Sequence, residues 1–199
     1  QQISRLGIPH VASLKGSEKC QSLPAYYGVI GSYGTRTANY ALQNCDLLVV
    51  LGSRMDVRQT GADTTDFARN AQIVQLDIDA SQLGNRVKAD LDIKADCADF
   101  FTGFENKLAN QLIMDREWMA CLAQHWTENF IDEYKDWSVS PFAICKLFEA
   151  SFSSLPVHYV ADVGNNQMWA AHSILLNQGQ AIHHSGGLGA MGFAIPTAI

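Results

Sequence analysis

The sequence predicts an α/β protein in which strands alternate with helices and build a mostly parallel sheet. Short continuous apolar runs, such as residues 46–52 and 72–77, are typical of parallel strands that are buried on both faces. Segments with helical spacing separate these runs, as expected for parallel strands joined by crossovers. Hydrophobic residues make up 47% of the 199 residues and charged residues 17%, which fits a well-packed globular chain.

The first half of the chain contains the clearest strands. Residues 46–52 end in Gly52, and we expect this strand to be central in the sheet. Ala38, Leu42 and Cys45 share one face of the helix that precedes it. A glycine-spaced loop is expected between the first strand and this helix. In order, the expected strands are residues 8–14, 46–52, 72–77 and 92–94, and the expected helices are residues 35–45 and 97–112.

A change of pattern divides the chain into two unequal units. Residues 112–137 place aromatic side chains among acids, which predicts a helical connection between the units. The next helix begins at Ser140-Pro141, because Ser is a good N-cap and Pro fits the first helical position. In order, the remaining elements are a strand at 157–161, a helix at 165–175, a strand at 181–184, a glycine-rich turn at 186–192 and a final helix.

Composition excludes several classes of function. The formal charge is −6, and the 14 basic residues are scattered, so we expect no nucleic-acid partner. No apolar run approaches ~18 residues, so we expect no membrane span. The five cysteines are widely spaced without a C-x-x-C pair, which favours reduced thiols in a cytoplasmic protein. The first residues also lack the pattern of a signal peptide.

The glycine-spaced loop is the first candidate ligand site. Gly28, Gly31 and Gly34 form the pattern G-x-x-G-x-x-G between a strand and a helix. Glycine permits positive φ angles and lets backbone N–H groups approach a phosphate or a ring closely. The spacing differs from the dinucleotide fingerprint G-x-G-x-x-G. The pattern therefore fits a ligand-binding loop and a tight surface loop equally well.

Two arginines follow the strand at residues 46–52. Gly52, Arg54 and Arg58 lie where this strand ends, and ligands dock at the carboxyl ends of strands in open parallel sheets. Two such arginines are suited to grip a diphosphate or to stack on a ring. The alternative is a solvated loop in which Asp56 pairs with an arginine, and the position at the strand end favours the ligand site.

The next strand also ends in a polar segment. Asp77 closes residues 72–77 and is followed by Ile78 and Asp79. A carboxylate at this place can accept a hydrogen bond from the ribose hydroxyl of a nucleotide. For Asp79 the alternative is to cap the following helix.

Two turns near the end of the chain point to an anionic, flat ligand. Residues 162–169, Asp-Val-Gly-Asn-Asn-Gln-Met-Trp, join a strand to a helix and so offer free N–H groups and the positive end of a helix dipole. Residues 185–193, Ser-Gly-Gly-Leu-Gly-Ala-Met-Gly-Phe, contain four glycines. Each glycine adds to the entropic cost of ordering the chain, so we infer a backbone that must approach a ligand closely.

These segments resemble the thiamine-diphosphate-dependent enzymes, and within them the large subunit of acetolactate synthase. The resemblance is most specific in residues 162–171, Asp-Val-Gly-Asn-Asn-Gln-Met-Trp-Ala-Ala, and residues 185–196, Ser-Gly-Gly-Leu-Gly-Ala-Met-Gly-Phe-Ala-Ile-Pro. Upstream, residues 52–61 resemble the central-domain loop of the family and residues 74–79 its next strand. The four segments follow the family's order along nearly the whole chain.

The resemblance implies a partial chain with three parts. Residues 1–111 would be the C-terminal part of a Rossmann-like central domain, residues 112–139 a helical connection, and residues 140–199 the beginning of the diphosphate-binding domain. It also implies an enzyme that decarboxylates pyruvate, a small 2-oxo acid, and transfers the two-carbon unit to an acceptor. The implied assembly is a homodimer or a homotetramer.

The same resemblance implies the residues that bind cofactors. Gly164, Asn165 and Asn166 would lie at the diphosphate of thiamine diphosphate. Gly189 and Met191 would lie at its aminopyrimidine, with the Met191 side chain holding the cofactor in its bent form. For FAD, which acetolactate synthases bind in the central domain, the implied contacts are Gly31, Gly34, Gly52, Arg54, Arg58, Asp77 and Ile78.

The chain departs from acetolactate synthase in two central-domain motifs. Ser32-Tyr33 replaces Met-His, and the five residues from Arg54 to Arg58 replace Arg-Phe-Asp-Asp-Arg. We therefore expect FAD to bind weakly or another nucleotide to take its place. We expect no catalytic residue and no metal ligand here, because the activating glutamate and the Gly-Asp-Gly segment that holds Mg²⁺ would lie outside the chain. The isolated chain is accordingly expected to be inactive.

Two other classes of protein fit parts of the pattern. A nicotinamide-dependent dehydrogenase would account for the α/β alternation and for Asp77, but it needs G-x-G-x-x-G in its first βα turn, and that motif is missing. A non-catalytic module could bind FAD or another nucleotide for structural reasons. Equilibrium binding of FAD and of thiamine diphosphate would separate these classes.

Overall fold

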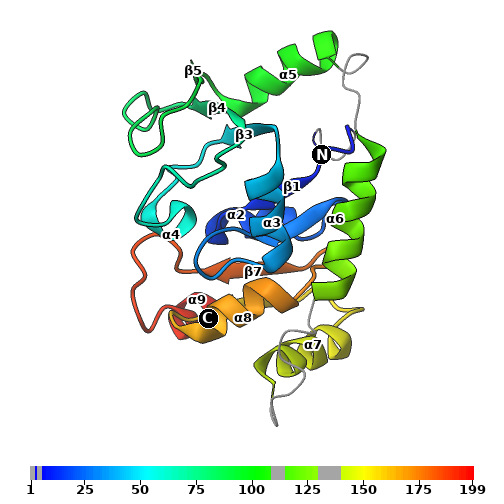
Figure 1. Cartoon of the computed structure of the whole chain (residues 1–199). Coiled ribbons are helices and arrows are strands. Elements are labelled where there is room, and N and C mark those ends of the chain that lie inside the picture. The colour runs from blue at the N-terminus through cyan, green and yellow to red at the C-terminus, as the bar shows by residue number, and fades with distance from the viewer. Residues whose placement is uncertain (1–2, 4–5, 109–114, 130–139) are drawn as a thin grey trace.

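The computed structural model describes residue 3 and residues 6–108, 115–129 and 140–199. Within these residues the strands form three small parallel sheets, with helices packed between and around them (Figure 1). This arrangement confirms the predicted α/β fold with parallel sheets. The expected boundaries at residues 111/112 and 139/140 lie outside the described residues. None of the helices in the described ranges has the length and apolarity needed to cross a bilayer.

The first sheet pairs β1 (His10–Ala12) with β2 (Tyr26–Val29) in parallel. The connection between them contains α2 (Leu14–Cys20), which Ser13 caps by accepting a hydrogen bond from the Gly16 N–H at 3.1 Å. The expected longer first strand, followed directly by a glycine-spaced loop, was wrong. Strand β2 was missed because Gly28 was assigned to that loop, and α2 was missed because its seven residues contain a glycine and few apolar side chains.

The second sheet has the order β3-β4-β5, with all strands parallel. Helix α3 (Arg36–Asn44), capped by Thr35, leads into it. The expectation that residues 47–51 form a parallel strand is confirmed, but their expected central position is wrong. In the described part of the chain β3 is an edge strand, and the side chains of Leu47 and Val49 are 51% and 37% exposed. The strands are β3 (Leu47–Leu51), β4 (Gln72–Asp77) and β5 (Leu91–Lys94).

One face of this sheet carries the main core. Because successive side chains of a strand point to opposite faces, Val50 is buried while Leu47 and Val49 are exposed. The core cluster consists of Ile30, Ala38, Leu42, Val50, Met55, Phe67, Ala68, Ile73 and Val87.

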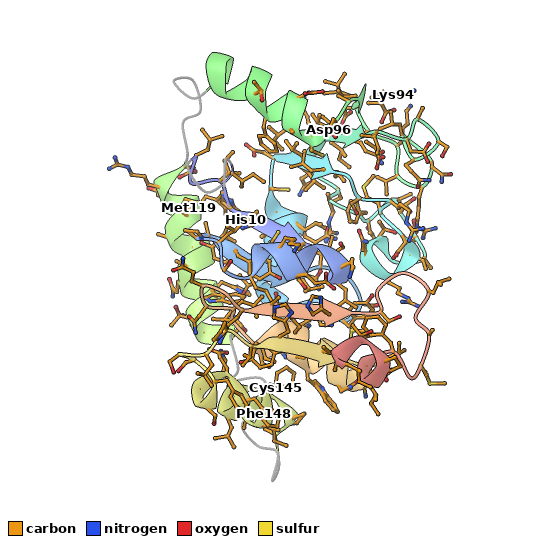
Figure 2. All side chains as sticks on the ribbon, turned by 180° about the vertical axis from the view of Figure 1, so that it is seen from behind. His10, Lys94, Asp96, Met119, Cys145 and Phe148 are labelled. Carbon is orange, nitrogen blue, oxygen red and sulfur yellow. The ribbon has the colours of Figure 1, made fainter. Side chains whose placement is uncertain are left out.

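Helix α5 (Cys97–Leu108) follows β5. At its start the Asp96 side chain (Figure 2) accepts a hydrogen bond from the Ala98 N–H at 2.7 Å.

The aromatic stretch of the sequence forms α6 (Arg116–Asn129), which packs against α3 (Figure 1). Leu122 is fully buried in a cluster with Tyr27 and Ala41. The Tyr40 ring stacks on His125, with ring centroids 4.5 Å apart. The helical part of the predicted connection is therefore held against the first unit by aromatic contacts.

The second unit pairs two parallel strands, β6 (His158–Ala161) and β7 (Ala181–His184). Its core consists of Ala161, Ala170, Ile174, Leu176 and Ile182. On α7, Cys145 packs against this core while Phe148 is half exposed (Figure 2). The helices are α7 (Pro141–Ser151), capped by Ser140 as expected, α8 (Asn165–Ser173) and α9 (Ala194–Ala198).

Helix α2 joins the two units. Its Glu18 carboxylate accepts from the His184 N–H of β7 at 2.8 Å and from the Lys15 ammonium at 2.7 Å. The Gln21 side-chain amide donates to the Ala171 carbonyl of α8 at 2.9 Å. Leu14 also packs in one cluster with Ala171. These contacts fix the carboxyl end of β7, directly before the glycine-rich turn.

Candidate functional site

The N-terminus of α8 presents backbone N–H groups that no side chain caps. Gly164 is the N-cap residue, with a φ of 137° that L side chains rarely adopt. The Gln167 N–H turns back to the Gly164 carbonyl at 3.3 Å. Among the described residues, no side chain accepts from the N–H groups of Asn165 or Asn166. These two donors are therefore available to an anion.

The other long helices of the described chain contrast with α8. Each has a polar side chain that accepts from its first-turn N–H groups. An uncapped N-terminus keeps its partial positive charge and its free donors, which suits a diphosphate. The geometry thus fits the predicted diphosphate contacts at the start of α8. The capping residues of the other helices are Ser13, Thr35, Asp96, Asp115 and Ser140.

Asp162 joins this strand-to-helix turn to the glycine-rich turn. Its Oδ1 accepts from the Val163 N–H at 2.7 Å and from the Gly192 N–H at 2.9 Å, and its Oδ2 accepts from the Ala194 N–H at 3.1 Å. Hydrogen bonds from Ala194 and Val163 lower the pKa of Asp162 below its usual range. Asp162 belongs to a motif of the sequence but had no predicted role. Its place at the end of a predicted strand was the signal that could have suggested one.

The glycine-rich turn leaves room beside its backbone. Gly189 and Gly192 have φ angles of 65° and 86°. An added Cβ at Gly187, Gly189 or Gly192 would meet no heavy atom of the described structure within 4 Å. The Met191 side chain is 84% exposed. The turn therefore presents glycine backbone and an apolar side chain to space that a ligand can occupy.

The glycine-spaced loop of the first unit has its N–H groups engaged by the protein. The Gly31 N–H donates to Asn39 Oδ1 at 2.9 Å, the Ser32 N–H to the Arg58 carbonyl at 2.8 Å, and the Gly34 N–H to the Gly31 carbonyl at 2.9 Å. A diphosphate would find none of these three donors free. In this structure Gly31 and Gly34 do not form an anion-binding cradle.

The absence of side chains in this loop serves protein packing. An added Cβ would lie 2.3 Å from Thr35 Oγ1 at Gly28, 2.1 Å from the Arg58 carbonyl oxygen at Gly31, and 2.4 Å from the Val29 carbonyl oxygen at Gly34. Such distances are far below van der Waals contact. The G-x-x-G-x-x-G spacing is thus accounted for by close contact between loops.

The segment after β3 exposes two arginines at the carboxyl end of the strand. Arg54 and Arg58 are both exposed, and Gly52 beside them has a φ of 57°. Asp56 accepts from the Arg58 backbone N–H at 2.9 Å and so caps the short helix α4 (Val57–Thr60). The guanidinium groups of Arg54 and Arg58 are the groups in this segment that suit a nucleotide phosphate.

At the end of β4, a buried residue is followed directly by an exposed one. Asp77 is buried, and its Oδ1 accepts from the Asp79 N–H at 2.9 Å. Ile78 is exposed. Asp79 accepts from the Ser81 N–H at 2.9 Å and stabilises a local turn instead of a helix. Within the described ranges, no three His, Cys, Asp or Glu side chains are grouped to hold a metal ion.

Parallel strands that lead into an uncapped helix N-terminus and an open glycine turn are features of α/β proteins that bind a diphosphate-bearing cofactor. The model of the thiamine pyrophosphate enzyme central domain matches residues 1–104. The model of the thiamine pyrophosphate enzyme C-terminal TPP binding domain matches residues 162–199. The chain belongs to the thiamine pyrophosphate enzymes.

Its relatives include proteins named as acetolactate synthase large subunits. A probable acetolactate synthase large subunit from Methanococcus aeolicus is 32% identical, over 99% of this chain and 35% of that protein. The Escherichia coli isozyme 2 large subunit is 32% identical, over 96% of this chain and 34% of that protein. The chain therefore spans about a third of the length of these relatives.

Proposed function

We propose that this chain is part of an acetolactate-synthase-like enzyme that decarboxylates pyruvate and transfers the two-carbon unit to an acceptor. The family match and the named relatives support this proposal. The observation that carries it is the pairing of the uncapped α8 N-terminus with the open glycine-rich turn. A cofactor with a diphosphate at one end and a flat ring at the other requires both features.

Each candidate residue has a role in this proposal. The N–H groups of Asn165 and Asn166 would bind the diphosphate, and Gly164 would let the backbone approach it. Gly189 and Met191 would contact the aminopyrimidine, since the Met191 side chain is exposed and an added Cβ at Gly189 would meet open space. When bound, thiamine diphosphate supplies a ring that accepts the electrons released as CO₂ leaves. The described residues orient the cofactor.

The remaining machinery is assigned to residues outside this chain. We propose that Mg²⁺ and the activating glutamate are held there, and that the functional enzyme is a cytoplasmic homodimer or homotetramer. The proposed division remains a central part at residues 1–111, a connection at 112–139 and the start of the diphosphate-binding domain at 140–199. The isolated chain should then release no CO₂ from pyruvate, and release of CO₂ by these 199 residues would contradict the division.

The test compares two positive-φ glycines in the full-length protein. Gly164 lies at the proposed site with a φ of 137°, whereas Gly179 lies in a remote turn with a φ of 82°. Alanine strains the backbone at both positions, by about 1–3 kcal/mol each, so the thermal unfolding of both variants is measured beside their binding. Calorimetric titration should show at least a tenfold higher Kd of thiamine diphosphate for Gly164→Ala and an unchanged Kd for Gly179→Ala. Equal affinities, or no saturable binding by the wild type, would contradict the proposal.

We also propose that the first unit binds FAD weakly or binds a different nucleotide. The replaced Ser32-Tyr33 motif and the engaged N–H groups of Gly31 and Gly34 support this. Arg54 and Arg58 would still attract a phosphate. The visible absorption of the purified full-length protein should show substoichiometric flavin. Flavin bands at about one per chain would overturn this second proposal.

A further inference from the structure

The carboxylate of Asp162 connects two segments that are far apart in the chain. It follows β6 directly and accepts from Val163 in its own turn. It also accepts from Gly192 and Ala194, which lie 30 and 32 residues further along the chain. Both carboxylate oxygens are therefore engaged, and one side chain holds the two turns of the proposed cofactor site together.

Little else holds the glycine-rich turn in place. Three of its glycines have open space where a side chain would lie. Leu188 and Met191 are exposed. In the described structure, the hydrogen bonds that join residues 187–194 to another element all end on Asp162. The position of the turn relative to the α8 N-terminus therefore depends on this carboxylate.

The bonds also divide the available N–H donors between two acceptors. Asp162 takes the donors at Gly192 and Ala194, at the start of α9. The donors at Asn165 and Asn166, at the start of α8, stay free. A diphosphate and the Asp162 carboxylate thus use neighbouring sets of N–H groups without competing for them.

We propose that Asp162 is a positioning residue that sets where Gly189 and Met191 meet the thiamine diphosphate bound at the start of α8. This inference rests on the proposed function. Gly192, which Asp162 binds, directly follows Met191 in the chain. A shift of the anchor therefore displaces the residue that would contact the ring, while the diphosphate donors of α8 stay where they are.

A carboxylate suits this position better than its neutral isostere. Two anionic oxygens accept from three N–H groups, and charge-assisted hydrogen bonds of this kind are short and strong. The side-chain amide of asparagine has one oxygen, so its NH₂ group would face a backbone N–H donor. Asp162→Asn should therefore release one side of the turn with little change in volume.

The test uses Asp162→Asn and a matched control in the full-length enzyme. Asp115 caps α6 by accepting from the Glu117 N–H at 2.8 Å, far from the cofactor site, so Asp115→Asn makes the same change of charge at a cap whose oxygen can still accept. At saturating thiamine diphosphate, Asp162→Asn should lower kcat by about 10- to 100-fold. Its Kd for thiamine diphosphate should rise by less than tenfold, because the α8 donors remain. Asp115→Asn should leave kcat and Kd unchanged.

Hydrogen exchange supplies a readout that does not depend on activity. In Asp162→Asn, amide exchange in residues 186–194 should speed up at least tenfold while exchange in α8 stays as in the wild type. Asp162→Glu keeps the charge and should restore part of kcat, and it serves as the test if the asparagine variant does not fold. A wild-type kcat in Asp162→Asn, or unchanged exchange in the turn, would overturn the inference. Failure of the wild type to bind thiamine diphosphate would instead overturn the proposed function.

Discussion

The glycines at residues 28–34 and those at residues 186–192 have opposite surroundings. In the loop at residues 28–34, an added Cβ would fall 2.1–2.4 Å from neighbouring protein atoms at each glycine. In the turn at residues 186–192, an added Cβ at three of the four glycines would meet no described atom within 4 Å. The first segment is closed by the protein itself, and the second leaves room for a ligand.

The difference shows that a glycine pattern does not by itself define a ligand site. N–H groups bind a phosphate only if no protein acceptor already engages them. In the first loop, Asn39 Oδ1 and the Arg58 carbonyl oxygen accept from the N–H groups. The α8 N-terminus beside the second segment has no capping side chain among the described residues.

Gly31→Ala should cause the largest loss of stability. The new Cβ would lie 2.1 Å from the Arg58 carbonyl oxygen, and the φ of 101° adds backbone strain. We expect the free energy of unfolding to fall by about 4 kcal/mol, measured by chemical denaturation of the full-length protein. Gly187→Ala, which meets open space, is the control. A Gly31→Ala protein as stable as this control would show that the first loop is not closed by packing.

Acidification should destabilise the base of the glycine-rich turn. Burial lowers the pKa of His184, the last residue of β7, from 6.5 to about 4. The folded protein thus keeps the ring neutral, while the unfolded chain binds a proton below pH 6.5. Stability from this residue is complete above pH 6.5 and is lost as pH falls towards 4, by about 2–3 kcal/mol at pH 4.5. His184→Gln should flatten this part of the stability profile, and an unchanged slope would contradict the assignment.

Met191→Ala should lower turnover without affecting folding. The side chain is 84% exposed, so its removal should change the free energy of unfolding by less than about 0.5 kcal/mol. If the side chain positions the cofactor ring, kcat should fall by about tenfold or more. Steady-state kinetics and thermal unfolding of the same preparation test both statements. Leu188→Ala, at an equally exposed position, should keep most of the activity.

Gly189→Ala and Gly187→Ala separate backbone strain from ligand approach. Both added methyl groups would meet open space, but only Gly189 has a positive φ, of 65°. Gly189→Ala should cost about 1 kcal/mol of stability and Gly187→Ala almost nothing. Binding of thiamine diphosphate should weaken more for Gly189→Ala. Equal stability of the two variants would show that the turn readily changes its φ angles.

Several features followed directly from local sequence patterns. Strands β3 and β4 and the Ser140-Pro141 start of α7 were predicted, because strand formation and capping depend on neighbouring residues. The expected burial of β3 on both faces was wrong, because Leu47 and Val49 are exposed at the sheet edge. Strand β2 was missed because its Gly28 belongs to the G-x-x-G-x-x-G pattern that predicted a loop, and α2 was missed because its seven residues contain few apolar side chains. The Ser13 cap was the one local sign of α2.

Local sequence patterns were enough to predict the α/β class, the order of the turns and the segments in which glycines cluster. These properties depend on spacing along the chain. The tertiary structure decided that β3 lies at a sheet edge, that Arg58 closes the Gly31 loop and that Asp162 binds the turn at Gly192. Each of these depends on groups that folding brings together from distant parts of the chain. The distance from an added Cβ to the nearest protein atom, 2.1 Å at Gly31 but more than 4 Å at Gly189, shows whether protein fills the space beside a glycine or leaves it open.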